Sequence, residues 1–189
     1  MFSDISLLAE NGIFGFDFDS MYNEWATKCF SYYMGAKAQF NPDRVDFDSL
    51  ADDYCRAGFG AAAKPVRAFL DAVERFTTSA AEANAADVCR HMGWAERRRH
   101  QNRLLEHLDF DALEAFLSEA RRAADGDDEV LGRIARFQFG MDLGRFSARK
   151  RLGRPSKPTA AEDEAHRRMI ADYLARDPSA FRASQLGIK

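Results

Sequence analysis

The stretch Gly12–Ser20 constrains the fold of this chain most, because aromatic residues alternate in it with small or acidic ones. Three phenylalanines at every second position would place their rings on one face of a strand, with Asp17 and Asp19 on the other face. No other part of the chain has a convincing strand pattern. Because a lone strand leaves backbone groups unpaired at both edges, we expect this one to need neighbouring strands that the sequence does not supply.

The rest of the sequence has the periodicity of helices. Apolar residues recur at spacings of three and four, and Asp46 and Asp109 stand where a helix needs an N-cap. Ser3 is expected to cap the first helix, and Gly12 to end it. The predicted helices cover residues 1–10, 21–40, 46–60, 61–86, 88–107, 110–124, 127–152 and 159–175.

Apolar stripes on these helices predict the core. The stripe on residues 21–40 is expected to be buried over much of the helix, and runs through Tyr22, Trp25, Cys29, Tyr32, Tyr33, Ala36 and Phe40. The helix at 61–86 is expected to bury Val66, Phe69, Leu70, Val73 and Phe76, and the helix at 110–124 to turn inward Leu113, Phe116, Leu117 and Ala120. The helix at 127–152 carries helical periodicity through Val130, Ile134, Phe137, Met141 and Leu143.

Composition narrows the class of protein. The chain has 189 residues, of which 46% are apolar and 30% charged, as in ordinary folded soluble proteins. A net charge of −3 gives no basic field for a phosphate backbone, so we expect no nucleic-acid partner. No apolar run approaches the roughly 20 residues that span a bilayer, and no signal-peptide pattern opens the chain. We expect a cytoplasmic protein with no membrane partner, or a fragment whose targeting signal lies upstream.

Residue types that bind metals or act as nucleophiles form no motif. Cys29, Cys55 and Cys89 have no metal-ligand spacing. The four histidines match no ligand pattern, and we expect these histidines at the surface. We therefore predict no metal and no cofactor. The basic residues between Arg145 and Lys157 fit the C-terminal end of a helix dipole. Contact with phosphate or RNA is the alternative reading of that cluster.

Residues 12–74 resemble the end of the catalytic barrel, and the helical region after it, in a family of alpha-glucuronidase-like glycoside-hydrolase proteins. Spaced positions along the stretch carry the resemblance, and no single short motif does. These positions are Gly15-Phe16-Asp17, Asn23-Glu24-Trp25, Tyr32-Tyr33, Ala36-Lys37, Asn41-Pro42, Asp53-Tyr54, Gly58-Phe59-Gly60 and Ala62-Ala63-Lys64-Pro65-Val66.

The resemblance implies a mainly α chain with one N-terminal βα unit, the last strand and helix of a TIM-like (β/α)8 barrel, and then a helical C-terminal domain. The expected domains are a barrel remnant at 1–41, a helical domain at 42–152, a linker at 153–158, and a C-terminal helix and tail at 159–189. The strand ends that carry barrel active sites would be missing. We therefore expect no catalytic residue in this chain.

The candidate substrate-binding residues are Asp17, Asp19, Asn23 and Trp25. On the predicted strand the two acids would point to the barrel axis, about 6.6 Å apart from the rise of a strand. Both would lie on one side of a sugar instead of flanking its glycosidic bond, so hydrogen bonding to hydroxyls is preferred over catalysis. The alternatives are an N-cap for Asp19, a buried hydrogen-bonded Asp17 and a core position for Trp25.

Two functional hypotheses follow, beside a third alternative, an intact small hydrolase, for which we expect no glycosidase turnover. The first is a C-terminal fragment of a carbohydrate-active, glycoside-hydrolase-like protein, catalytically incomplete alone, with a glycan bound through the full-length barrel. The second is a non-enzymatic helical scaffold or interaction module whose N-terminal strand pairs with another chain. The same strand, with its uncovered phenylalanines, would favour self-association.

Overall fold

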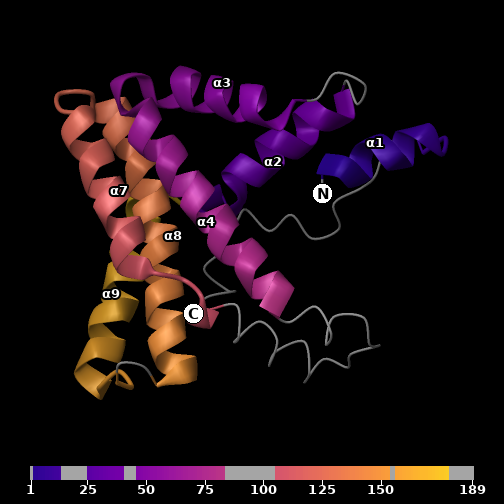
Figure 1. Cartoon of the computed structure of the whole chain (residues 1–189). Helices are drawn as coiled ribbons and strands as arrows, with labels where there is room; N and C mark the ends of the chain where they lie inside the picture. The colour runs from indigo at the N-terminus through magenta and orange to yellow at the C-terminus, as the bar shows by residue number, and fades with distance from the viewer. Residues whose placement is uncertain (1, 14–24, 41–45, 84–104, 154–155, 179–189) are drawn as a thin grey trace.

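A computed structural model describes residues 2–13, 25–40, 46–83, 105–153 and 156–178 of the chain (Figure 1). These residues are mainly helical and contain no β-strand. The elements are α1 (Phe2–Glu10), α2 (Trp25–Phe40), α3 (Phe47–Phe59), the 3-10 helix η2 (Gly60–Ala62), α4 (Ala63–Ala83), α7 (Phe110–Ala123), α8 (Asp128–Leu152) and α9 (Ala160–Arg176). None of these helices is both long enough and apolar enough to cross a membrane.

Local sequence explains most of the helix ends. The Asp46 carboxylate accepts a hydrogen bond from the Ser49 backbone N–H at 3.0 Å and begins α3, as predicted. Asp109 caps α7 in the same way, and Gly153 ends α8 in a left-handed conformation with φ of 67°. The predicted cap at Ser3 is wrong, because that residue lies inside α1.

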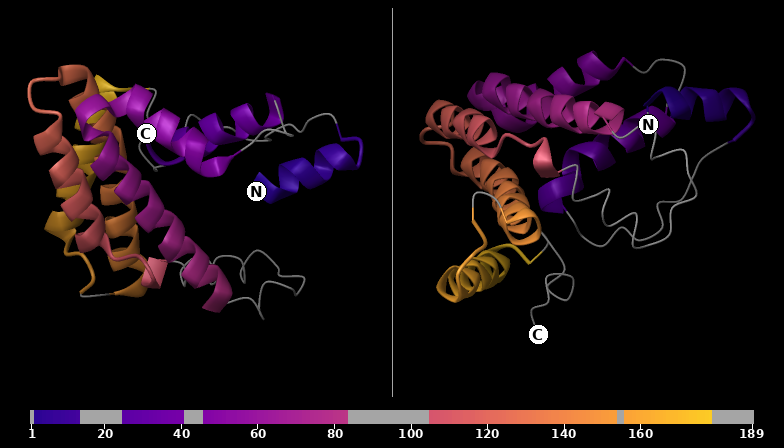
Figure 2. Two further views of the ribbon diagram at one scale, coloured as in Figure 1. Left: turned by 45° about the horizontal axis from the view of Figure 1, so that its top comes forward. Right: turned by 60° about the horizontal axis from the view of Figure 1, so that its bottom comes forward.

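The helices form a layered bundle with a projecting N-terminal part. Figure 2 shows α4, α7, α8 and α9 lying beside one another in that order, with α9 on the side of α8 away from α4. Helix α3 lies across one end of this bundle and packs on α4, while α2 packs on α8 and carries α1 outward (Figure 1). The described part of the chain therefore consists of a bundle and an arm attached to it through α2.

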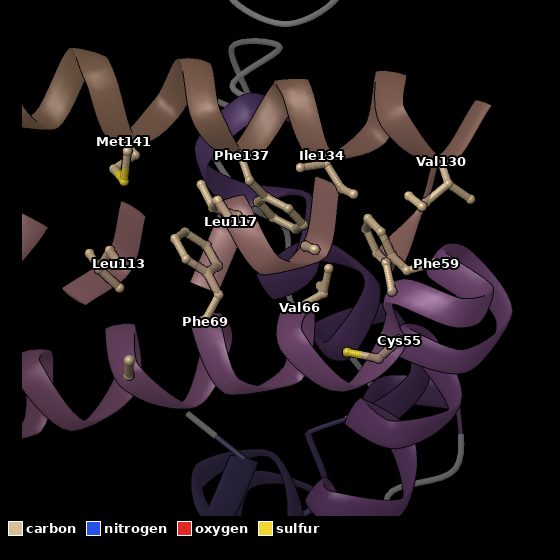
Figure 3. Packing of buried hydrophobic residues seen from close by; sticks show 14 residues of the cluster. Cys55, Phe59, Val66, Phe69, Leu113, Leu117, Val130, Ile134, Phe137 and Met141 are labelled. Atoms are coloured by element: carbon tan, nitrogen blue, oxygen red, sulfur yellow. The ribbon is translucent and has the colours of Figure 1, made fainter. Parts of the chain in front are cut away.

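The main core lies where α3, α4, α7 and α8 meet. Figure 3 shows Phe137 of α8 pointing between Phe59 of α3 and Phe69 of α4, and the ring centroids are 5.7 Å and 5.5 Å apart. Leu117 of α7 and Val66 of α4 are fully buried beside them. The predicted inward faces of α4 and α7 are confirmed here, because their periodic apolar residues pack against this cluster.

Helix α8 buries residues on two sides, which the single predicted stripe did not anticipate. Val130, Ile134, Phe137 and Met141 face the main core as expected. Leu143 instead joins Phe139 in a second, smaller cluster with Ile170 of α9. A helix enclosed on both sides has apolar residues around much of its circumference, so one stripe does not describe it.

The prediction of an N-terminal βα unit from a TIM-like barrel is wrong. The part of the chain that the structure describes has no strand, and α2, the helix expected to cover a sheet, packs on α1, α3 and α8. The predicted strand lies outside the described residues except for Ile13, which belongs to no strand. Alternation of apolar and polar residues specifies a strand only when a neighbouring strand completes the hydrogen-bonded ladder. The described elements are helices, which supply no such neighbouring strand.

Candidate functional site

The four predicted substrate-binding residues are not assembled by the structure. Asp17, Asp19 and Asn23 lie outside the described residues, and Trp25 is the first residue of α2. Their role in binding a sugar stays a prediction.

The most distinctive surface belongs to the N-terminal arm, which we define as residues 2–13 and 25–40. Phe40, at the end of α2, has 92% of its surface exposed, and Leu7 of α1 and Ile13 have 57% and 44% exposed. Among the described residues, these are the large apolar side chains that remain exposed. All three belong to the arm, and apolar side chains exposed to solvent are candidates for contact with a partner.

The position of Ile13 follows from how α1 ends. The Gly12 backbone N–H donates to the Ala9 carbonyl at 3.0 Å, and the Ile13 N–H donates to the Leu8 carbonyl, also at 3.0 Å. Together with the left-handed Gly12 (φ 78°), this is a Schellman motif, in which glycine avoids the steric cost of a side chain. The turn therefore fixes the exposed Ile13 beside the C-terminal end of α1.

Helix α2 is held by aromatic contacts near its middle. The rings of Phe30 and Tyr33 lie 5.1 Å and 5.0 Å from the ring of Tyr54 on α3. Met34 and Ala38 are fully buried farther along the helix. Phe40 is therefore exposed at the end of a helix whose preceding turn is packed.

This arrangement corrects the aromatic stripe predicted for residues 21–40. Cys29 and Tyr33 are partly buried as expected, but Ala36 and Phe40 are exposed, and the fully buried side chains are Met34 and Ala38. The reason is that α2 turns the side of the helix that carries Met34 and Ala38 toward its neighbours. Its larger final residue is left outside the contact, and no pattern within α2 alone reveals that choice.

A shallow groove of about 570 Å³ lies between the beginning of α8 and the end of α9. Its charged side chains are engaged within the protein: Arg136 Nε contacts Asp177 Oδ2 at 2.7 Å, and Arg133 Nη1 donates to the Gly58 carbonyl at 2.6 Å. Three arginines and three carboxylates line the groove, so neither sign of charge prevails. We assign these residues to holding the helices together.

A polar network joins α7 to α8. The Gln138 Nε2 amide donates to Glu114 Oε2 at 2.9 Å and to Asp142 Oδ1 at 3.0 Å, and Arg121 Nη2 donates to Glu114 Oε1 at 2.8 Å. Burial alone would raise the pKa of Glu114, but these hydrogen bonds outweigh it and lower the pKa, whereas burial raises that of Asp142. The network clamps two helices and was not found by sequence motifs, since its outermost members, Glu114 and Asp142, are 28 residues apart in the sequence.

Residues with metal-binding or nucleophilic chemistry are also used structurally. Within the described ranges, no group of three or more histidine, cysteine or acidic side chains is placed to hold a metal ion. Burial raises the pKa of Cys29, whose Sγ lies 3.5 Å from the Tyr54 hydroxyl, and raises that of Cys55 to about 11. A thiol with a raised pKa is a poor nucleophile at neutral pH.

The predicted basic cluster is largely paired where it is described. Arg149 Nη2 contacts Glu162 Oε1 at 2.9 Å and Lys150 Nζ contacts Asp163 Oδ1 at 3.4 Å, which joins the end of α8 to the beginning of α9. Arg145 donates to the Phe110 carbonyl at 2.7 Å. These cations stabilise helix contacts, in agreement with the interpretation that they lie at a helix C-terminus.

Comparisons of the chain with protein-family models, with curated proteins and with solved structures find no match. The resemblance to glycoside-hydrolase-like proteins, and the glycan partner that it implies, therefore stay predictions. The interaction surface on the N-terminal arm is independent of both.

Proposed function

We propose that this chain is a non-enzymatic helical scaffold that pairs with a second copy of itself through the N-terminal arm. One observation carries the proposal: Leu7, Ile13 and Phe40 are exposed on the arm, while the bundle buries its large apolar residues within the described part of the chain. Aromatic side chains dominate the energy of many protein interfaces when a partner covers them. Phe40 is the residue best placed to be such an anchor.

The charges of the arm set the conditions under which two copies can pair. A two-fold interface brings the same surface together twice, so any net charge on it repels itself. The sequence from residue 2 to residue 40 carries five acids, Asp4, Glu10, Asp17, Asp19 and Glu24, and two lysines, Lys28 and Lys37, and its net charge is therefore −3. Pairing of two arms must bury enough apolar surface to outweigh this repulsion, which salt screens.

Replacing Phe40 with serine tests this function. We expect the wild-type chain to form dimers in a concentration-dependent way, and Phe40→Ser to remain monomeric at the same concentrations, because the buried aromatic area is lost. Sedimentation velocity over a concentration series measures both. Since Phe40 is 92% exposed, its replacement should leave the melting temperature nearly unchanged.

Ala115→Ser on the exposed face of α7 provides a control away from the arm, and it should dimerise like the wild type. A wild-type chain that stays monomeric over the whole series would refute pairing through the arm. So would a Phe40→Ser variant that dimerises as strongly as the wild type.

A further inference from the structure

Helix α9 is held on α8 by side chains arranged in layers. The Arg149–Glu162 and Lys150–Asp163 ion pairs form the first layer, and the ring of His166 stacks on Phe146 in the next, with centroids 3.7 Å apart. Tyr173 stacks on Phe139 at 3.9 Å farther along, and Arg136 pairs with Asp177 at the end of α9.

This interface is separate from the main core. Its buried residues are Phe139, Leu143 and Ile170, and the residues packed against them, Met169, Tyr173 and Leu174, all belong to α9. The main cluster draws on α3, α4, α7 and the opposite side of α8. Because so few buried residues hold α9, it can open locally at a lower free-energy cost than the bundle.

His166 is the group in this interface whose charge changes near neutral pH. Its ring is half-buried, and the Lys150 ammonium on α8 lies 5.9 Å from the centroid of the same Phe146 ring. Asp163 on α9 is the acid that favours the protonated form of His166, but its carboxylate already pairs with Lys150 Nζ at 3.4 Å. Protonated His166 would therefore place a partly desolvated positive charge against Phe146, close to the positive charge of Lys150.

We propose that α9 is a detachable strap and that protonation of His166 weakens its docking on α8. Release exposes Phe139 and Leu143 on α8 and the apolar face of α9. The protein then has two arrangements, one with the strap docked and one with an additional apolar surface, and the proton selects between them.

The sign of the pH dependence follows from linkage. Burial, together with Lys150, lowers the pKa of docked His166 below its ordinary value of 6.5, although Asp163 acts in the opposite direction. The released helix therefore binds the proton more readily, and docking weakens as the pH falls below 6.5. Glu162 stays ionised in this range, because hydrogen bonds from the Thr159 backbone and Arg149 lower its pKa to about 2.

Hydrogen exchange on the full chain at pH 7.5 and 5.5, expressed as protection factors, tests the strap. We expect the protection of α9 amides to fall at the lower pH by more than that of α7 amides. His166→Phe keeps a ring against Phe146 but cannot take up a proton, so its α9 protection should not change with pH. NMR titration of the wild-type imidazole should show a midpoint below 6.5, coinciding with the loss of α9 protection.

Equal protection of α9 in the wild-type chain at the two pH values would overturn the proposal. An acid-induced loss of α9 protection that is as large in His166→Phe as in the wild type would also overturn it, since another group would then be responsible. Neither outcome depends on whether the N-terminal arm pairs with a second copy.

Discussion

At the scale of single residues, arginine side chains join several of the helices to one another. Arg67 of α4 is the clearest example, since its Nε donates to Asp71 at 2.8 Å and its Nη2 donates to Asp48 at 2.6 Å, while Nη1 contacts Asp52. The side chain is only 18% exposed. One guanidinium thus compensates three carboxylates on two helices.

Removing this guanidinium should be more harmful than removing an exposed one. We expect Arg67→Ala to lower the free energy of unfolding by about 1–3 kcal/mol, because Asp48, Asp52 and Asp71 would lose their common partner. Arg56→Ala is a matched control, since Arg56 is 76% exposed and pairs only with Asp53 in the described structure, and it should cost at most about 1 kcal/mol. Urea denaturation of both variants measures the difference, and equal losses would contradict the assigned role.

At the scale of elements, each helix depends on a few residues at its ends. Helix α9 begins with a capping box: the Thr159 hydroxyl accepts from the Glu162 backbone N–H at 3.2 Å, and the Glu162 carboxylate accepts from the Thr159 N–H at 2.8 Å. These bonds satisfy backbone donors that the first turn leaves unpaired. The polar sequence of α9 gains little from burial, so its cap matters more.

We expect Thr159→Ala to destabilise α9 by about 0.5–2 kcal/mol, the usual cost of losing an N-cap. Because α9 packs in its own small cluster, the loss should appear as faster hydrogen exchange in α9, with α4 and α7 unaffected. Thr159→Ser retains the hydroxyl and should exchange like the wild type. If exchange in the bundle rises together with that in α9, the strap is not an independent unit.

At the scale of the whole molecule, α8 is the element on which both clusters depend. Phe137 lies in the main core with 7% of its surface exposed, and Phe139 lies in the α8–α9 cluster with 2% exposed. Two positions apart on a helix, the side chains point in different directions. The same helix therefore stabilises the bundle with one side and docks the strap with another.

Truncating these two phenylalanines should have different global effects. Phe137→Ala is expected to lower the free energy of unfolding by about 3–5 kcal/mol, because it leaves a cavity among α3, α4 and α8. Phe139→Ala should remove protection from α9 while leaving most of the global stability. Calorimetry combined with hydrogen exchange separates the two, and a similar drop in melting temperature for both variants would show that the clusters form one cooperative unit.

Much of the secondary structure could be predicted from the sequence. The caps at Asp46 and Asp109 and the end of the helix before Gly153 are confirmed, because each acts through hydrogen bonds or backbone angles within a few residues. The candidate site could not be predicted in the same way. Phe40 belongs to an aromatic pattern that favours burial, and its exposure depends on which side of α2 meets α8 and α3.

Apart from the beginning of α1, most ends of the described helices and the apolar faces of α4 and α7 follow from the sequence, since these properties depend on neighbours along the chain. Three further features come from tertiary contacts: α8 is buried on two sides, Arg133 reaches the carbonyl of Gly58, and Phe40 remains exposed. Each of these depends on residues far apart in the chain. Burial is a property of the contact between two surfaces, and the pattern of one helix specifies only its own surface.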